Sequence, residues 1–450
     1  MSRKIITIVC IILLVSGMGI CQARVSTEEA AKLKTILTPL GAERAGNADG
    51  TIPEWTGGIT DYPYTEGENL PNPYPDDKVL FKITADNYQQ YADKLSDSQI
   101  EMFKKYPDKF WMPVYPTRRS AAAPQWVYDN TYKNALNAAV TQDGNGVDGA
   151  CGGIPFPIPQ NGIEVLQNHL MRWQGTTVKY HHIAISGFDN APSSEIYTAE
   201  LIWQYPYYME NGKCEGDGLF SFDIIYLTPP RRKGELLLVN DFVNANKRPR
   251  EAWQYIPGQR RVRRAPTVAF DTPDTSISTY EDAYMYNGSP EKFNWELLGK
   301  KEMYIPYNSY DSVAGWSNGK VGMEEMTPGY PNADKYLRWE LHRVWIVEGT
   351  LKEGERHIHP KRKLYIDEDS WTAAIHDRWD QKGQLWRFSF ANIQQYYDKI
   401  QAPVMRPVFI KDLISGEYGA AYNSVSPTVA VDPLPDEYFT PQGLRKRAKR

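Results

Sequence analysis

Apolar and polar residues alternate over much of the second half of the chain. Between residues 336 and 348 nearly every second side chain is apolar and most of those between are polar, as in a strand with one buried face. Seven more segments, each bounded by turn residues, also predict strands: 176–186, 195–208, 219–228, 234–242, 356–366, 369–379 and 384–390. Because no regular helix separates most of these neighbours, the pattern predicts antiparallel pairing in a long sheet or open barrel.

The first part of the chain has helical spacing instead. Apolar positions recur at the intervals of helices over 26–38, 84–106 and 161–174. Ser26 and Asn161 are placed to cap the first and the third of these helices. We expect the second and third helices to form a lid over the sheet.

Residues 40–77 contain too many glycines and prolines for regular structure. The same stretch carries Trp55, Tyr62, Tyr64 and Tyr74, and a solvated linker rarely holds so many aromatic side chains. We therefore expect a strap that lies on the folded body.

The first residues have the pattern of an export signal. Arg3 and its basic neighbour precede an apolar run over 5–15, and Cys21 and Ala23 supply small residues for cleavage after Ala23. The run is too short to span a bilayer, which takes about 20 apolar residues, so we expect a soluble mature chain. Lipidation of Cys21 stays open as an alternative, although Ile20 before it is larger than such a site favours.

No internal repeat and no low-complexity linker divides the mature chain. The sequence therefore predicts a signal peptide over 1–23 and a single domain over 24–450. Within that domain, 24–175 should hold the helices, the strap and the lid helix, 176–415 the antiparallel sheet, and 416–450 a C-terminal extension.

Charge and composition narrow the class of protein. The 450 residues are 13% aromatic with 30 tyrosines, and the formal net charge of −4 becomes about −6 when Arg3 and Lys4 are removed. Without a basic field over the whole chain, nucleic acid is not the expected partner. The basic residues from 445 to 450 suggest a solvated tail that can touch an anionic membrane surface.

Two of the four cysteines leave with the signal peptide, so only Cys151 and Cys214 remain. Exported proteins meet an oxidising compartment, and a disulfide between these two is the expected state. On the chain-entropy model its loop would contribute about 4 kcal/mol. Two unpaired buried thiols are the alternative.

Motifs for catalysis or cofactor binding are missing from the sequence. There is no Gly-x-Ser-x-Gly elbow, no phosphate-binding loop and no dinucleotide fingerprint, so we expect neither an enzyme nor a cofactor. His357 and His359 share one face of a predicted strand and, with an acid from 367–369, are weak metal candidates. The neighbouring cations at 361–363 oppose a metal there.

An unusual cluster of arginines follows Trp253. Arg260, Arg261, Arg263 and Arg264 surround one valine after a Pro-Gly turn, and on a strand they point to both faces. They can bind acidic headgroups or the carboxylates of a partner, or they can form ion pairs with acids on neighbouring strands.

Five ordered motifs together resemble the bacterial family called domain of unknown function 1329, and they cover nearly the whole mature chain: 37–53, 152–159, 255–266, 365–371 and 438–442. The arginine motif is also similar to the strand and turn of outer-membrane lipoprotein-sorting proteins of the LolA/LolB type. The resemblance implies a β-rich α+β fold, in which a large curved antiparallel sheet forms a half-barrel and helices cap an apolar cavity.

The same resemblance implies a periplasmic protein, with outer-membrane association open, that acts with a resistance-nodulation-division (RND) exporter and an outer-membrane partner. We therefore expect a carrier for a lipid or another hydrophobic molecule, in which Trp339 and Trp345 contact the cargo and the four arginines dock a headgroup or partner. Two alternatives are a metal-assisted hydrolase that uses His357, His359 and an acid from 367–369, and a cargo-free adaptor of an envelope complex.

Overall fold

The computed structural model describes residues 25–189, 191, 193–209, 216–265, 270–317, 337–424 and 426–449. The predicted signal peptide lies outside the described residues, and so does Cys214 of the predicted disulfide. Among the described residues, no helix combines the length and apolarity that crossing a membrane requires.

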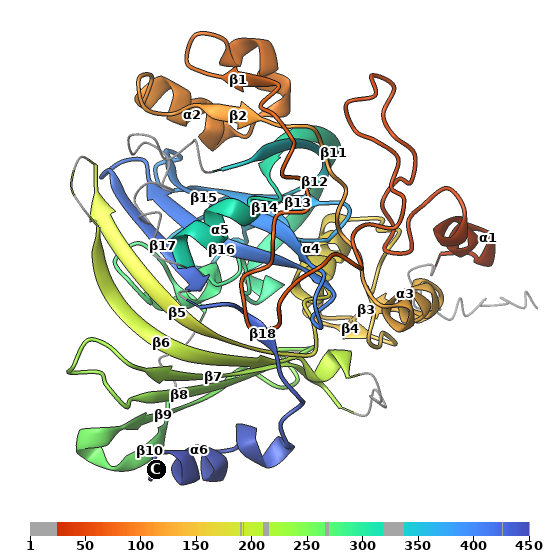
Figure 1. Cartoon of the computed structure of the whole chain (residues 1–450). Coiled ribbons are helices and arrows are strands. Elements are labelled where there is room, and N and C mark those ends of the chain that lie inside the picture. The colour runs from red at the N-terminus through yellow and green to blue at the C-terminus, as the bar shows by residue number, and fades with distance from the viewer. Residues whose placement is uncertain are drawn as a thin grey trace, which may run out of the picture.

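One large curved sheet organises the molecule (Figure 1). Within the described residues it has 16 strands in the order β1-β2-β12-β13-β14-β15-β16-β17-β5-β6-β7-β8-β9-β10, with β11 paired to β12 and β18 to β5. The strands are β1 (Phe81–Ile83), β2 (Met112–Val114), β5 (Thr177–Phe188), β6 (Ser194–Gln204), β7 (Gly218–Tyr226), β8 (Leu236–Phe242), β9 (Glu251–Ile256), β10 (Arg261–Arg264), β11 (Phe293–Pro306), β12 (Trp339–Leu351), β13 (Lys361–Asp367), β14 (Ala373–Trp379), β15 (Leu385–Tyr396), β16 (Ala402–Asp412), β17 (Glu417–Ser424) and β18 (Val429–Ala430).

Almost all neighbouring strands in this sheet are antiparallel, and the short contact between β2 and β12 is the parallel one. In Figure 1 the long strands β5 and β6 bend around the interior, and β7–β10 continue the sheet toward the C-terminal helix. These features confirm the predicted curved antiparallel sheet. A separate two-stranded sheet joins β3 (Ala139–Val140) to β4 (Val147–Asp148).

Six α-helices accompany the sheet in the described part of the chain: α1 (Thr27–Ala31), α2 (Asp97–Lys105), α3 (Gln125–Asn137), α4 (Gly162–Leu170), α5 (Tyr310–Ser317) and α6 (Pro441–Arg447). The third predicted helix is confirmed as α4, where Asn161 accepts a hydrogen bond from the Glu164 backbone at the N-cap. The second is split, because Ser96 adopts an extended conformation and starts α2 with its own capping box after a 3₁₀ segment at Tyr88–Lys94.

Apolar side chains form two main clusters on opposite faces of the central strands. On β13, Leu364 and Ile366 belong to the larger cluster with α4, while Tyr365 between them belongs to the cluster with α2. The same alternation on neighbouring strands separates the two faces. The expectation that helices 84–106 and 161–174 form one lid is therefore wrong, because α2 and α4 cover different faces of the sheet.

The segment 40–77 is the strap that its composition predicted. The Trp55 indole donates a hydrogen bond to the Ala121 carbonyl at 3.0 Å, and Tyr62 meets the Tyr397 ring edge-on. Gly41 is needed where it stands, because its φ is +103° and a Cβ would lie 1.9 Å from the Pro157 carbonyl oxygen. The Trp371 indole donates to the Leu40 carbonyl at 2.7 Å, so the first and fourth motifs pack together.

The predicted C-terminal tail is folded onto the sheet. Leu444 of α6 is fully buried against an apolar cluster on β8, and Arg447 forms an ion pair with Asp223 of β7 at 2.6 Å. The prediction of a solvated basic tail is therefore wrong for Arg447, which meets a buried acid, whereas Arg445, Lys446 and Lys449 are exposed as expected.

Candidate binding cavity

A small cavity, with a free volume of about 50 Å³, lies on the face of the sheet that α4 covers. Strands β6–β8 form its floor, the C-terminal end of α4 borders it, and residues 270–292, here called the cavity loop, close it. Aromatic and aliphatic side chains make up most of its wall, among them Leu170, Trp203, Tyr205, Phe220, Phe242 and Tyr284.

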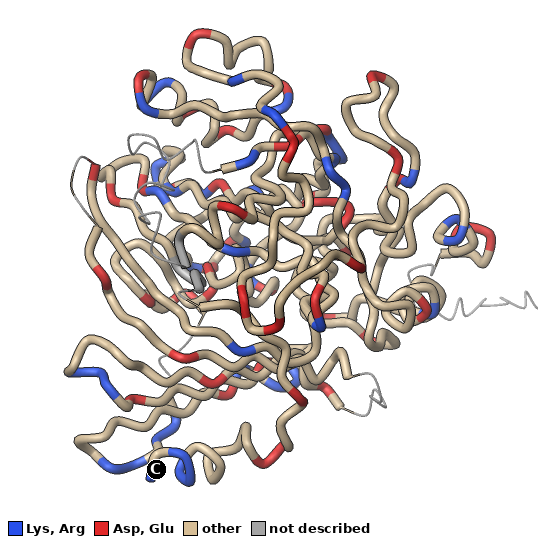
Figure 2. The backbone as a smooth tube through the Cα atoms, viewed as in Figure 1, with Lys and Arg blue, Asp and Glu red and all other residues tan. Residues whose placement is uncertain are grey.

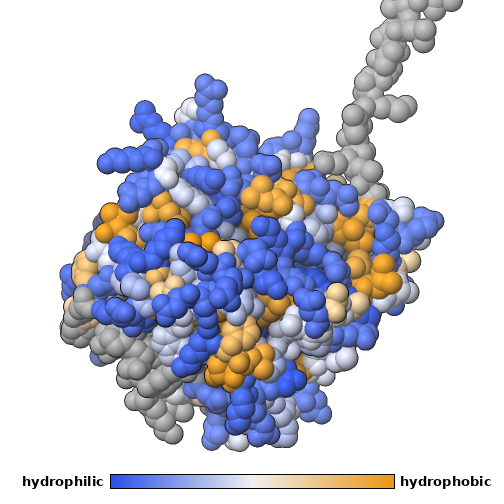
Figure 3. All heavy atoms as spheres, turned by 90° about the horizontal axis from the view of Figure 1, so that it is seen from above, coloured by the Kyte–Doolittle hydropathy of each residue, from blue (hydrophilic) through white to orange (hydrophobic). Residues whose placement is uncertain are grey.

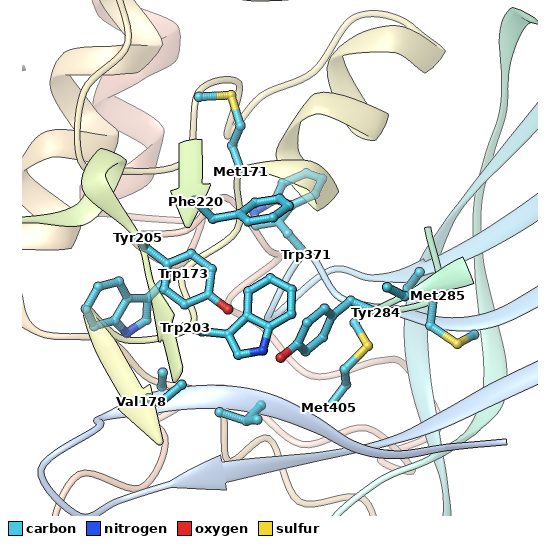
Figure 4. Close-up of a cluster of buried hydrophobic side chains, with 14 of the residues drawn as sticks. Met171, Trp173, Val178, Trp203, Tyr205, Phe220, Tyr284, Met285, Trp371 and Met405 are labelled. Atoms are coloured by element: carbon cyan, nitrogen blue, oxygen red, sulfur yellow. The ribbon is translucent and has the colours of Figure 1, made fainter. Parts of the chain in front are cut away.

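The aromatic wall is built by cross-strand neighbours. Trp203 on β6 lies opposite Phe222 on β7, with ring centroids 4.6 Å apart. Phe220 packs against the same indole at 5.1 Å, and the Tyr284 ring meets it edge-on at 4.8 Å (Figure 4). Such contacts stabilise an aromatic group beyond its area of burial, so this wall is held in one arrangement.

The backbone of the cavity loop is strained at its centre. Tyr284 and Met285 both have positive φ, at 51° and 71°, a conformation that bulky residues rarely adopt. Two buried histidines hold it there, because His376 Nδ1 lies 2.9 Å from the Met285 carbonyl and His169 Nε2 lies 3.1 Å from the Tyr286 carbonyl. The strain therefore persists because the surroundings fix the loop on both sides.

His169 connects this loop to α4 and to β14. His169 Nδ1 lies 3.1 Å from the backbone N–H of Ala373 and 3.2 Å from the Trp371 carbonyl, and its Nε2 faces the Tyr286 carbonyl. The Ala373 donor favours the tautomer in which Nε2 carries the proton and donates to Tyr286. Complete burial, assisted by the charge of Arg172, holds the pKa of His169 well below its ordinary value. The imidazole is neutral at physiological pH and acts as a structural hydrogen-bond bridge.

Buried ion pairs hold the preceding part of the cavity loop. Arg362 donates to the Glu281 carboxylate at 2.8 Å, and Arg378 pairs with Asp282. His357 also reaches Glu281, with its Nε2 3.0 Å from Oε1. Burial acts to raise the pKa of Glu281, but Arg362 and His357 outweigh it and lower that pKa to about 2.

Two arginines in the cavity wall have different surroundings. Arg250 forms a bidentate pair with Asp241, at 2.7 and 2.6 Å, and also donates to Asn287. Arg172 follows α4, is 3% exposed, and donates to the His169 carbonyl at 2.6 Å and to the Gln174 side chain at 2.8 Å. Among the described residues no carboxylate lies within ion-pair distance of Arg172. Burial lowers the pKa of Arg172 to about 10, so the group stays protonated at neutral pH.

Three N–H groups of other residues in the cavity wall lack an acceptor within the described chain. They are Gln167 Nε2, Asn145 Nδ2 and Trp203 Nε1. Each buried donor without an acceptor costs about 1–3 kcal/mol, and the described chain has others outside the cavity, as at Trp339 and Arg362. The wall therefore combines apolar rings with several unused donors.

The four predicted docking arginines lie together at the edge of the sheet. Arg261, Arg263 and Arg264 belong to β10, whose one partner among the described strands is β9, and Arg260 occupies the turn between the two strands with φ 51°. All four are exposed, and no acid of the described residues lies within ion-pair distance of them. Together with basic residues of α6 they gather at one end of the molecule (Figure 2). We call this β9–β10 unit the arginine hairpin.

The two tryptophans predicted to contact cargo do not line this cavity. Trp339 is fully buried in the cluster on the opposite face of the sheet and packs against Phe390. Trp345 stacks on Trp371 at 6.2 Å, and the Lys300 ammonium lies 5.1 Å from its ring centroid. Both residues contribute to packing between segments.

The predicted histidine pair lies beside cations. His357 contacts Glu281 and Arg362, and the His359 ring packs against Trp386 at 4.9 Å. Burial, and then Arg378 and other cations, hold the pKa of His359 well below its ordinary value. Protonation is disfavoured there, and a metal ion would meet the same repulsion.

Acids of the 367–369 segment instead meet His342, and atoms of His342, Asp367 and Asp369 lie within 4.8 Å of one another. Most of their ligand atoms are occupied, because Arg119 takes both oxygens of Asp369 at 2.9 and 2.6 Å. Asp367 Oδ1 faces His342 at 3.7 Å and accepts no hydrogen bond within the described chain. Asp367 Oδ2 accepts from the backbone and hydroxyl of Ser370. The arrangement is that of an ion-pair network that joins the strap to β13.

Comparison with known proteins gives three kinds of match. Residues 82–445 match the family described as protein of unknown function (DUF1329). The uncharacterised protein PA3922 of Pseudomonas aeruginosa is 43% identical over 438 residues, which cover 95% of each chain.

Among solved structures, an outer membrane lipoprotein-sorting protein domain from Vibrio parahaemolyticus is 17% identical, with a TM-score of 0.43 over 63% of this chain and 98% of that one. A DUF1329 family protein from Desulfovibrio piger is 14% identical, with a TM-score of 0.42 over 62% and 95%. The LolA superfamily protein NE2245 from Nitrosomonas europaea is 11% identical, with a TM-score of 0.37 over 63% and 98%.

Proposed function

This chain belongs to the DUF1329 family, and we propose that it is a carrier that shields a hydrophobic molecule in the cavity beneath the cavity loop. The observation that supports this most directly is the aromatic wall of the cavity, because small-molecule sites are lined mainly by apolar and aromatic side chains. The free volume of about 50 Å³ is below the usual range of such sites, so cargo would have to displace the cavity loop. Each 100 Å² of apolar cargo surface removed from water there would contribute about 2.5 kcal/mol.

Outside this cavity, a hollow of about 430 Å³ lies between β7–β9 and the segment before α6, but most of its lining residues are polar. On the face shown in Figure 3, hydrophilic side chains surround separate small apolar patches. Large exposed apolar residues such as Ile36, Leu80 and Phe188 are far apart in sequence and belong to different segments. Single exposed apolar residues are ordinary, so the aromatic-lined cavity is the better candidate for cargo.

The proposed setting is the periplasm, where the carrier would pass cargo between an RND-type exporter and an outer-membrane partner. The predicted export signal and the family resemblance support this setting. The arginine hairpin is the proposed docking surface, because its four exposed cations have no acidic partner among the described residues and are available to an acidic surface.

A blocked cavity tests the carrier proposal. Leu219→Trp adds an indole inside the cavity wall, whereas Leu227→Trp adds the same group at a residue that is 39% exposed, just after the same strand. We expect the wild type and L227W to bind the neutral fluorescent probe N-phenyl-1-naphthylamine, and L219W to lose most of this binding.

The protein made in its own host should also carry a molecule that native mass spectrometry and lipid extraction detect. Equal probe binding by L219W and wild type would contradict the proposal. A protein that is always empty, yet purifies with an envelope partner, would favour the cargo-free adaptor instead.

A further inference from the structure

The structure also indicates the chemistry of the cargo's polar end. We infer that the cavity takes an amphiphile whose polar end is an anion, a carboxylate or a phosphate ester, and that Arg172 is its counter-ion. This inference rests on the proposed carrier function and goes beyond it by naming a class of ligand.

Arg172 is a buried cation whose charge is not balanced by a described acid. Burying an unpaired charge is costly, and most buried arginines of this chain avoid the cost with a carboxylate: Arg250 meets Asp241, Arg362 meets Glu281, and Arg378 meets Asp282. Arg172 lies in the same cavity wall as Arg250 but has two neutral acceptors instead.

Two other buried arginines without an ion pair among the described residues have a different compensation. Arg406 lies 3.4 Å from the Tyr180 ring centroid and Arg387 lies 4.3 Å from that of Trp386, the geometry of a close cation–π contact. Arg172 is 5.7 Å from the Tyr284 ring, near the limit of that interaction. Of these three arginines, only Arg172 lines the cavity.

The unused donors of the wall point to the same kind of ligand. Gln167, Asn145 and Trp203 each present an N–H without an acceptor among the described residues, and all three line the cavity together with Arg172. Because these three groups are hydrogen-bond donors, a ligand that satisfies them must supply acceptors. Hydrogen bonds to an ionised acceptor are the strongest that such donors form. An anionic oxygen cluster can satisfy several of them at once.

The apolar rings exclude a free inorganic anion as the best fit. Trp203, Phe220 and Tyr284 surround the polar groups, and a small ion would leave these rings exposed to water. A hydrocarbon tail covers them, and an anionic head then meets Arg172. Only an amphiphile contacts both the aromatic rings and the polar groups of the wall.

A structural role for Arg172 is the competing explanation, because its bond to the His169 carbonyl caps the end of α4. Three probes with twelve carbons each distinguish a structural role of Arg172 from a role in ligand binding: dodecanoate, dodecyl phosphate and 1-dodecanol. For the wild type we expect at least one anion to bind about 10- to 100-fold tighter than the alcohol. The two anions compared with each other tell whether a carboxylate or a phosphate is preferred.

Replacing Arg172 should remove this preference. In Arg172→Met we expect the ratio of anion to alcohol affinity to fall to about 1, with binding of 1-dodecanol retained. The matched control Arg356→Met removes an exposed arginine that lies outside the cavity wall and the arginine hairpin and should keep the wild-type ratio. If R172M does not fold, Gln167→Leu removes one unused donor and should lower the ratio about threefold with 1-dodecanol binding unchanged.

The outcomes distinguish this inference from the carrier proposal. If none of the three probes binds the wild type, the carrier proposal fails. If 1-dodecanol binds as tightly as both anions, the carrier proposal stands and the anion inference is wrong. A preference for anions that survives in R172M, or in Q167L when R172M does not fold, also overturns the inference.

Discussion

Replacing Glu281 with Gln tests how the cavity loop is held in place. Glu281 is 3% exposed and accepts from Arg362, which is fully buried, at 2.8 Å, and its carboxylate lies 3.0 Å from His357. A neutral amide leaves the Arg362 charge buried without its counter-ion. Removing one partner of a buried pair costs about 3–5 kcal/mol, and we expect that loss in the free energy of unfolding.

The size of the protein sets the shift in melting temperature. Unfolding entropy is about 2.1 cal/mol/K per residue, so about 430 residues give roughly 0.9 kcal/mol per degree. A loss of about 4 kcal/mol then lowers Tm by about 4 °C, which calorimetry at pH 7 resolves. Glu296→Gln on β11 is the matched control, because Glu296 is exposed and has no ion pair within the described chain, and its Tm should stay within 1 °C of the wild type.

The pH dependence of the same variant gives a second test. The pKa of Glu281 is lowered from its ordinary value of 4.5 to about 2, so the folded state favours the ionised form. This contribution is complete above pH 4.5 and is lost as the pH falls through 4.5 toward 2. The stability difference between wild type and E281Q should therefore narrow by about 3 kcal/mol over this window. An unchanged Tm at pH 7, or a difference that does not narrow in acid, would refute the reasoning.

Three further predictions concern the surface, the cysteines and the histidine cluster. Replacing the four arginines of the arginine hairpin with serine should weaken binding to vesicles that contain phosphatidylglycerol, and binding by the wild type should fall with salt; equal binding by both proteins would rule out this surface. Cys151→Ser should expose the thiol of Cys214 to alkylation without reductant and lower stability by about 4 kcal/mol, whereas free thiols in the wild type would disprove the disulfide. Chelator treatment should leave Tm within about 1 °C, because Arg119 already occupies both oxygens of Asp369, and a large loss of Tm would instead indicate a structural metal.

The strands that alternate in polarity could be predicted from the sequence, and those that do not were missed. All eight predicted strand segments correspond to strands of the sheet. By contrast, β16 is buried along its whole length and contains Pro403 and Pro407, so it has neither alternation nor the expected composition. In β11 most residues before Met303 are partly or fully exposed, and Gly299 interrupts the pattern with a bulge.

The cavity depends on contacts between distant segments, and this limits what the sequence can show. Arg172 follows a helix that was predicted, but a basic residue at such a position is ordinary helix capping. Its lack of an acidic partner is visible only when β6–β8 and the cavity loop are in place. The left-handed backbone of Tyr284 and Met285 also has no local signal, since neither residue type favours it.

The contacts of the cavity loop determine what it costs to reach the cavity. A loop fixed by apolar packing exposes its apolar area to water when it moves, at about 25 cal/mol per Å². The Glu281–Arg362 and Asp282–Arg378 pairs regain hydration when they separate, which offsets most of their lost attraction. Opening the intact loop should therefore cost less than the loss in E281Q, where Arg362 stays buried without its partner. Because its contacts are polar, the cavity loop can cover the aromatic wall in the resting state and still open at a modest cost in free energy for the proposed cargo.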